Sequence, residues 1–217
     1  FRDNDNMKIT IFGHCCMLIE ENGLRILTDP GDYTTAQTEV KNIDVILITH
    51  EHADHLHVES LKTALANNPQ AKIITNKGVG VILEKEGILY TLVDDGKETT
   101  EKGVRIKGFG KDHAEIYKTW KSVENTSYFI GERLFYPGDA FYNPNRPVEI
   151  LALPVAGPWL KIAEVIEYAL AVKPKFCFPV HDGVLTRTGS TYRITGTIVG
   201  EAGIEFKVLE LGKKYEW

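Results

Sequence analysis

Four of the seven histidines lie within eight residues, in the segment His50-Glu-His-Ala-Asp-His-Leu-His57. Histidine is the commonest metal ligand in proteins and also the side chain that titrates near neutral pH. Crowding the rings together raises the electrostatic cost of protonating any one of them. Because the spacing His-x-His-x-Asp-His rarely arises from composition alone, it predicts a metal centre rather than a solvated, histidine-rich loop.

The apolar run Ile43–Thr49 comes directly before this segment and predicts a strand buried on both faces. Alternate residues of an extended chain project to the same side, so His50 and His52 can share one metal ion. We expect Asp54 and His55 to start the following helix, with their side chains facing back toward the strand end. Imidazole with carboxylate suits Zn²⁺, and a more oxygen-rich shell also admits Mn²⁺ or Fe²⁺.

Two more histidines follow predicted strands far along the chain. His113 comes after the strand expected at Val104–Phe109, and His181 comes after the one expected at Lys175–Val180. A single histidine in such a place is usually a surface or hydrogen-bonded residue. The cluster at residues 50–55 needs further ligands to close its coordination shells, which favours a ligand role for both.

The elements that must position these residues alternate in two similar halves. Apolar periodicity predicts further strands at Lys8–Phe12, Cys15–Glu20, Leu24–Thr28, Lys72–Thr75, Ile88–Val93, Thr126–Ile130, Arg133–Tyr136, Ile150–Pro154 and Glu205–Leu209, and helices at Val58–Ala66, Val79–Glu86, Leu160–Val172 and 190–200. Strand clusters followed by βα alternation, twice, predict an α/β fold of two packed sheets with helices outside. Because no linker separates the halves, we expect one domain at 7–217, after a tail or expression remnant at 1–6.

The overall composition is that of an ordinary globular protein. The 217 residues carry 25 basic and 30 acidic side chains, for a net charge of −5. This charge gives no general reason to expect nucleic acid or an anionic membrane as partner, although a local basic groove stays open. No apolar run reaches the roughly 18 residues that a membrane span needs. Three cysteines, two of them adjacent, form no disulfide framework, which favours a cytoplasmic location.

The motif His50-Glu-His-Ala-Asp-His55 resembles the signature of the metallo-β-lactamase-fold hydrolases. Other elements of that family occur here in the same order: Asp29-Pro30, His113, Gly138-Asp139 and His181. Phe12-Gly-His14 and Leu18-Ile-Glu20 further resemble the small subgroup that includes ascorbate-phosphate lactonase. The resemblance covers residues 7–217 and implies a four-layer αββα sandwich.

The resemblance also implies two divalent metal ions, with Zn²⁺ preferred over Mn²⁺ or Fe²⁺. The implied ligands form a first set, a second set and a bridge: His50, His52 and His113; Asp54, His55 and His181; and Asp139. A hydroxide bridging the two ions would attack a carbonyl or phosphorus centre. Asp54 would be the catalytic residue that orients this water and takes its proton.

Departures from the family narrow the expected activity. Dedicated β-lactamases of this fold typically lack a bridging aspartate, so Asp139 argues against β-lactamase activity. The chain has no room for the helical substrate domain of glyoxalase II.

Around the ligands, we expect Asp29 to orient metal-bound imidazoles. We expect His57 at the surface or behind the ligands. His14 either lines a pocket or is a hydrogen-bonded histidine within the sheet, and Tyr142 and Trp159 either shape a pocket or pack in the aromatic core.

These residues predict an enzyme that cleaves a small ester, lactone or phosphorylated molecule. One alternative is a metal-dependent phosphodiesterase or nuclease with the same site, which predicts a basic groove. The other is a non-catalytic metal-binding protein. The complete set of seven ligands argues against this last alternative, because a vestigial site is expected to have lost ligands.

Overall fold

Two seven-stranded sheets and four α-helices make up the computed structural model, which describes residues 6–217. The first sheet contains β1 (Lys8–Gly13), β2 (Cys16–Glu21), β3 (Leu24–Thr28), β4 (Val45–Leu47), β5 (Lys72–Thr75), β6 (Thr91–Leu92) and β14 (Lys214–Glu216). The second contains β7 (Glu98–Glu101), β8 (Val104–Phe109), β9 (Ser127–Ile130), β10 (Leu134–Tyr136), β11 (Ile150–Pro154), β12 (Phe176–Val180) and β13 (Glu205–Phe206). The helices are α1 (Val58–Asn67), α2 (Lys77–Lys85), α3 (Ile162–Val172) and α4 (Gly189–Glu201). Of the tail expected at 1–6, all but the last residue lies outside the described part.

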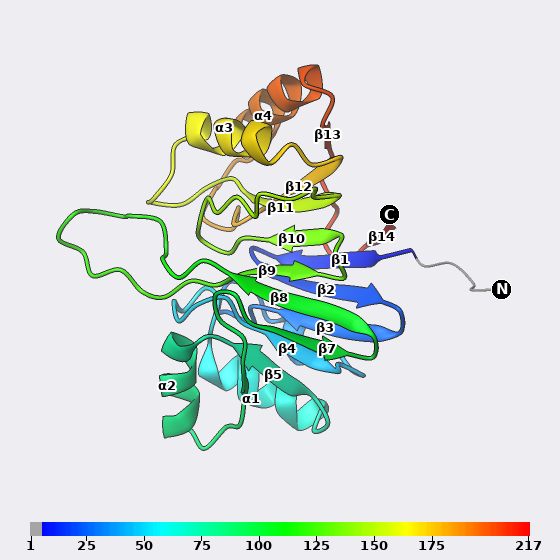
Figure 1. The fold of residues 1–217 in the computed structure, drawn as a ribbon, viewed down its shortest axis with the longest axis vertical. Coiled ribbons are helices and arrows are strands. Elements are labelled where there is room, and N and C mark those ends of the chain that lie inside the picture. The colour runs from blue at the N-terminus through cyan, green and yellow to red at the C-terminus, as the bar shows by residue number, and fades with distance from the viewer. Residues whose placement is uncertain (1–5) are drawn as a thin grey trace.

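Three apolar clusters separate four layers of structure. The first joins the inner faces of the two sheets and includes Met17 and Tyr128. The second holds α3 and α4 against the outer face of the second sheet, and the third holds α1 and α2 against the outer face of the first. Figure 1 shows these two pairs of helices at opposite ends of the molecule. The expected arrangement of two mixed sheets with helices outside is confirmed.

Strand direction brings distant residues to one edge. β3, β4 and β5 are mutually parallel, and β1 runs the same way because two antiparallel pairings separate it from β3. In the second sheet β10, β11 and β12 are parallel, and β8 shares their direction for the same reason. Within each sheet, the residues that follow these strands therefore meet at the carboxyl-terminal edge.

Several elements differ from those predicted. Helix α1 begins at Val58 because His57 is still extended, so Asp54 and His55 lie in a turn before the helix and do not start it. Strand β4 is shorter than the apolar run, and only Thr91–Leu92 of the strand expected at Ile88–Val93 pairs with β5. Strands β7 and β14 were not predicted, because their side chains are largely polar and exposed. The helix expected at 190–200 is confirmed as α4.

Residues 110–126 form a long connection between β8 and β9. In Figure 1 this green loop extends away from the sheets. Of the helices in residues 6–217, none has the length and apolar character needed to cross a bilayer.

Candidate metal centre

The predicted ligands gather where the two sheets meet. Each follows a strand of shared direction: residues 50–55 follow β4, His113 follows β8, Asp139 follows β10 and His181 follows β12. His14, which was not a predicted ligand, reaches the same place after β1. The two sheets are joined at this point, because the backbone N–H of His181 donates to the carbonyl of His14 over 3.1 Å. Segments up to 167 positions apart in the chain therefore form one cluster.

The first donor set contains His50, His52, His113 and Asp139. One ligand atom from each lies within 4.8 Å of the others. His50 Nε2 is 3.1 Å from His52 Nδ1, and His113 Nε2 is 3.3 Å from Asp139 Oδ2. His52 is half-buried while the other three are buried, so the set opens to solvent on the side of His52. The structure thus brings together the residues predicted for the first metal.

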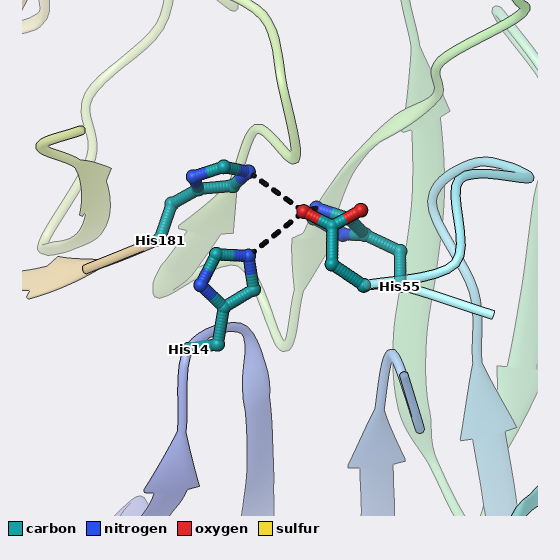
Figure 2. Close-up of side chains that lie close together, drawn as sticks. His14, His55 and His181 are labelled. Carbon is teal, nitrogen blue, oxygen red and sulfur yellow. Dashed lines mark hydrogen bonds and ion pairs between the residues drawn. The ribbon is translucent and has the colours of Figure 1, made fainter. Parts of the chain in front are cut away.

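The second donor set contains Asp54, His55 and His181, with His14 beside them. His181 Nε2 lies 3.4 Å from Asp54 Oδ2, and His55 Nε2 lies 3.7 Å from the same oxygen. Figure 2 shows His14, His55 and His181 reaching one place from three separate segments. All three residues predicted for the second metal are present, and His14 is an addition that the sequence did not assign to either metal.

Asp139 lies between the two sets. Its Oδ1 is 3.2 Å from Nε2 of His55, while its Oδ2 is 2.9 Å from Nε2 of His181 and 3.3 Å from that of His113. The side chain therefore contacts residues of both sets at once. This is the position that a bridging carboxylate requires.

Buried polar atoms without hydrogen-bond partners indicate whether these residues suit a metal. Within residues 6–217, the buried side-chain atoms without a hydrogen-bond partner include His55 Nε2, His113 Nε2, Asp139 Oδ1 and both ring nitrogens of His181. Leaving such atoms unpaired inside a protein costs roughly 1–3 kcal/mol each. Because all of these atoms belong to the two donor sets, and imidazole with carboxylate is a common shell for divalent ions, the residues fit bound metal.

Asp29 contacts the second set from the side away from the hollow. Its Oδ1 accepts the backbone N–H of Thr49 over 2.8 Å, and its Oδ2 accepts the Thr49 hydroxyl over 2.7 Å. The same Oδ2 lies 2.7 Å from Nδ1 of His55 and also accepts the hydroxyl of Tyr136. The carboxylate therefore fixes the orientation of the His55 ring and leaves its Nε2 to face the cluster.

Asp139 is held by contacts that the sequence did not reveal. Gly138 has φ +62°, and a Cβ there would lie 2.4 Å from Asn125 Oδ1. That oxygen accepts the backbone N–H of Asp139 over 3.1 Å. Asn125 lies 14 positions away with no distinguishing motif, so only the fold identifies it. Cys15 also lies beside His55 and Asp139, and burial raises the pKa of its thiol.

The pKa values of the cluster residues depend on two opposing effects, burial and the charge of neighbouring side chains. Burial lowers the pKa of His50 well below its usual value, so this ring is neutral and able to bind metal. Burial acts in the same direction on His181, but the carboxylates of Asp139 and Asp54 outweigh it and raise the pKa of His181 to about 9. Conversely, burial opposes ionisation of Asp139, but His55 and His181 hold its pKa below the usual range.

A hollow of about 390 Å³ opens onto the cluster, and it is lined by residues that include His52, Asp54, His113, Asp139, Trp159 and His181. Trp159 lines it as predicted, and its indole N–H donates to Asp139 Oδ2 over 2.9 Å.

Three other side chains near the histidine motif or the pocket lie outside this hollow. Tyr142 instead lines a separate hollow beside Gly110 and packs against Phe109. His14 lies buried behind Asp54, to which its ring hydrogen-bonds, and does not line the hollow. Of the alternatives expected, the structure thus has aromatic packing for Tyr142 and a buried, hydrogen-bonded position for His14. His57 is exposed and its Nδ1 contacts Ser60, which agrees with the surface position expected.

Comparison with known families and proteins gives a consistent result. The model of the beta-lactamase superfamily domain matches residues 8–181 of this chain. Protein Rv0786c of Mycobacterium tuberculosis is 35% identical over 184 residues, which cover 82% of this chain and 85% of that protein. The UPF0173 metal-dependent hydrolase Ta0764 of Thermoplasma acidophilum is 26% identical over 193 residues, covering 82% and 84% of the two chains.

Among solved structures, Igni18 of the archaeon Ignicoccus hospitalis, described as a novel metallo hydrolase, has the same fold. The two structures superpose with a TM-score of 0.78 at 19% sequence identity, over 98% of each chain. At 98% of this chain, the similarity extends past the residues that the family model matches and includes most of helix α4.

Proposed function

The chain belongs to the beta-lactamase superfamily, and from this premise we propose a dinuclear metal-dependent hydrolase that cleaves a small ester, lactone or phosphorylated substrate. The observation that carries the proposal is the position of Asp139 between two donor sets, each with three further ligand-capable side chains. The first metal would take His50, His52 and His113, and the second would take Asp54, His55 and His181. Zn²⁺ is the preferred ion for this shell, with Mn²⁺ or Fe²⁺ as alternatives.

Two divalent ions, when bound, would lower the pKa of a water and polarise the oxygen of the carbonyl or phosphoryl group whose carbon or phosphorus is attacked. Asp54 is positioned to guide that water, because its carboxylate is only half-buried and faces the hollow. Burial opposes its ionisation, but the hydrogen bond from His14 and the ion pair with His181 hold its pKa well below the usual range. A carboxylate so stabilised as an anion orients a water and accepts its proton only transiently.

Metal content and substrate preference test the proposal together. Elemental analysis of the purified protein should find close to two transition-metal ions per chain. A panel of lactones, carboxylic esters, phosphate monoesters and phosphodiesters should then be assayed with Zn²⁺ and with Mn²⁺. Protein that cannot be loaded beyond one ion per chain would contradict the dinuclear centre, and activity on none of the small substrates would contradict the substrate class.

Asp54→Ala tests the assigned catalytic residue. We expect turnover of the best substrate to fall by about 100-fold or more, since removing a positioned acid–base group costs roughly 10²–10⁴. His57→Ala is the matched control, because it removes an exposed histidine of the same motif that contacts only Ser60 at its ring. Circular dichroism should show both variants folded. Full turnover by Asp54→Ala would remove this residue from the mechanism.

A second candidate function, hydrolysis of a phosphodiester or nucleic acid, is favoured by the loop between β8 and β9. A second hollow, of about 430 Å³, shares His52 and His113 with the first and is otherwise lined by this loop. Its lining includes Trp120, two-thirds exposed, and the lysines Lys118 and Lys121. Exposed aromatic rings beside lysines can stack bases and hold phosphates.

Trp120→Ala separates the two candidates. If a single-stranded nucleic acid is the substrate, we expect the variant to raise KM about tenfold, since one base stacked on an aromatic ring contributes roughly 1–3 kcal/mol. KM for a small lactone or ester should not change. Leu89→Ala, at an exposed apolar residue outside the loop, is the control. Unchanged KM for every nucleic acid in the panel would reject the second candidate.

We also propose that the protein works in the reducing environment of the cytoplasm. Cys15, Cys16 and Cys177 are all buried free thiols, which such an environment preserves. Fractionation of cells that express the native protein tests this location.

A further inference from the structure

His14 occupies the turn between β1 and β2, where its ring faces the second donor set (Figure 2). Its Nε2 lies 3.0 Å from Asp54 Oδ2, and the residue is only 3% exposed. By proximity alone His14 is a fourth ligand beside Asp54, His55 and His181. The hydrogen bonding of its other ring nitrogen leads to a different role.

Two of the proposed ligand histidines share one arrangement of their ring nitrogens. Nδ1 of His55 contacts the Asp29 carboxylate at 2.7 Å, and Nδ1 of His113 contacts the carbonyl of Ala114 at 2.6 Å. Since both partners only accept, each Nδ1 must carry the hydrogen. Nε2 can then offer its lone pair to a metal. In both rings Nε2 has no hydrogen-bond partner within the described chain and faces Asp139, at 3.2 Å for His55 and 3.3 Å for His113.

In His14 this arrangement is reversed. Its Nδ1 is 3.1 Å from the backbone nitrogen of Gly183, whose N–H can only donate. Nδ1 must therefore be the acceptor, and the hydrogen of the neutral ring resides on Nε2. A protonated ring, with hydrogens on both nitrogens, could not accept the bond from Gly183. The Nε2–H group faces Asp54 Oδ2, which accepts it.

We infer that His14 is a positioning residue, which binds no metal and holds Asp54 through this Nε2–H hydrogen bond. The inference rests on the dinuclear centre proposed above and assigns a role to a residue beside its second donor set. Because His14 does not line the hollow, it acts through Asp54 and not on substrate. Tyr33 stacks on the ring at a centroid distance of 4.4 Å and helps to fix its orientation.

Trp159 provides a parallel for the other carboxylate ligand. Its indole nitrogen is a donor only, so it cannot bind a metal, and it donates to Asp139 Oδ2. Asp54 and Asp139 thus each receive one N–H hydrogen bond from a ring outside the proposed ligand shell. Each such bond restrains which way a carboxylate oxygen faces, and this orientation determines how the oxygen meets an ion and a water.

NMR of protein labelled with ¹⁵N-histidine tests the inference directly. Long-range ¹H–¹⁵N spectra should show His14 as the Nε2–H form both without metal and after loading with ¹¹³Cd²⁺. The His55 and His113 signals should acquire ¹⁵N–¹¹³Cd coupling on loading, while the His14 signal should not. Coupling between ¹¹³Cd and His14, or loss of its Nε2 hydrogen on loading, would overturn the inference.

Two variants separate positioning from a merely structural role. His14→Gln can place an amide N–H near the position of Nε2, whereas His14→Asn retains a polar group near Nδ1 and loses the bond to Asp54. Asparagine also tolerates the left-handed backbone of this residue, φ +53°. We expect His14→Asn to weaken binding of one ion, or to lower kcat, by about 10–100-fold, as loss of such supporting contacts does. His14→Gln should stay within about threefold of the wild-type protein.

The outcomes distinguish this inference from the function on which it rests. Equal losses in both folded variants would overturn the positioning role. Elemental analysis finding one ion per wild-type chain would contradict the dinuclear proposal. The hydrogen position on His14 would still be read from the metal-free spectrum, where an Nδ1–H form would refute the inference by itself.

Discussion

Asp29 shows how a residue that binds no metal can determine what its neighbour binds. Its buried carboxylate accepts hydrogen bonds from Nδ1 of His55, from the backbone N–H and the hydroxyl of Thr49, and from the hydroxyl of Tyr136. The histidine can then present only Nε2 to the cluster. Which ring nitrogen can bind a metal therefore depends on which nitrogen carries the hydrogen, and not only on the presence of a histidine.

Asp29→Asn tests this dependence. An amide in place of the carboxylate removes the negative charge that stabilises the His55 ring and loses at least one of the four hydrogen bonds. We expect affinity for one of the two ions to fall about 10–100-fold, with the other ion little affected. Competition with a coloured chelator measures both affinities. Two unchanged affinities would show that the His55 ring needs no such support.

Residue types, their spacing and the family resemblance led to side chains that the structure brings together in one cluster, because chemistry restricts which side chains bind metals. Asp54, His55 and Asp139 were identified without knowledge of the contacts around them. The orientation of a ring is different, because it depends on partners distant in the chain. His14 meets Gly183 at a separation of 169 positions, and nothing local to Phe12-Gly-His14 reveals that contact.

At the scale of elements, the segment from β4 to α1 turns where a helix was expected to begin. The backbone N–H groups of His55 and Leu56 both donate to the carbonyl of His52, which folds the segment back toward the strand end. The turn packs against the loop after β3, where the backbone N–H of Asp32 donates a hydrogen bond to the carbonyl of Ala53. Close approach of these two loops sets the position of Asp54.

Gly31→Ala tests the importance of this approach. A Cβ on residue 31 would lie 1.9 Å from the carbonyl oxygen of Asp54, so the turn must shift. We expect a loss of about 1–3 kcal/mol in the free energy of unfolding, together with weaker metal binding. Gly189→Ala, where an added Cβ meets nothing within 4 Å, is the matched control. Chemical denaturation and chelator competition measure the two effects, and equal behaviour of both variants would contradict the argument.

Strands and helices were predicted well where apolar residues recur with a regular period. They were missed where a strand is fixed only by pairing with a segment distant in the chain. The fully buried strand β4 and the amphipathic helix α3 have strong patterns, so both were identified from sequence. Strand β14 was missed because Lys214–Glu216 has no apolar alternation of its own and is fixed by pairing with β1, some 200 positions away. Such edge strands depend on the tertiary structure more than on local sequence.

For the molecule as a whole, metal and protons compete for the same cluster. In the metal-free protein burial favours a neutral His181, but the neighbouring carboxylates prevail and raise its pKa to about 9. Below that pH the ring carries a proton, which an arriving ion must displace. Metal affinity should therefore increase as the pH rises and level off above about 9.

Isothermal titration of Zn²⁺ in two buffers of different ionisation enthalpy measures this release. We expect about one proton or more to leave per chain at neutral pH, and affinity to increase up to tenfold per pH unit for each proton displaced. Titration of His57→Ala should give the same release, because the exposed ring of His57 lies outside the cluster. Affinity that is independent of pH from about 7 to 9 would contradict a protonated His181.

The hydrogen bond from His181 to the carbonyl of His14 ties the carboxyl-terminal edge of one sheet to that of the other. Each donor set also draws members from both sheets, so the distances between ligands depend on the alignment of one sheet over the other. Truncation of Met17, which is buried in the layer between the sheets, should therefore weaken ion binding as well as lower the melting temperature. The affinity for metal therefore reports how accurately the two sheets are aligned.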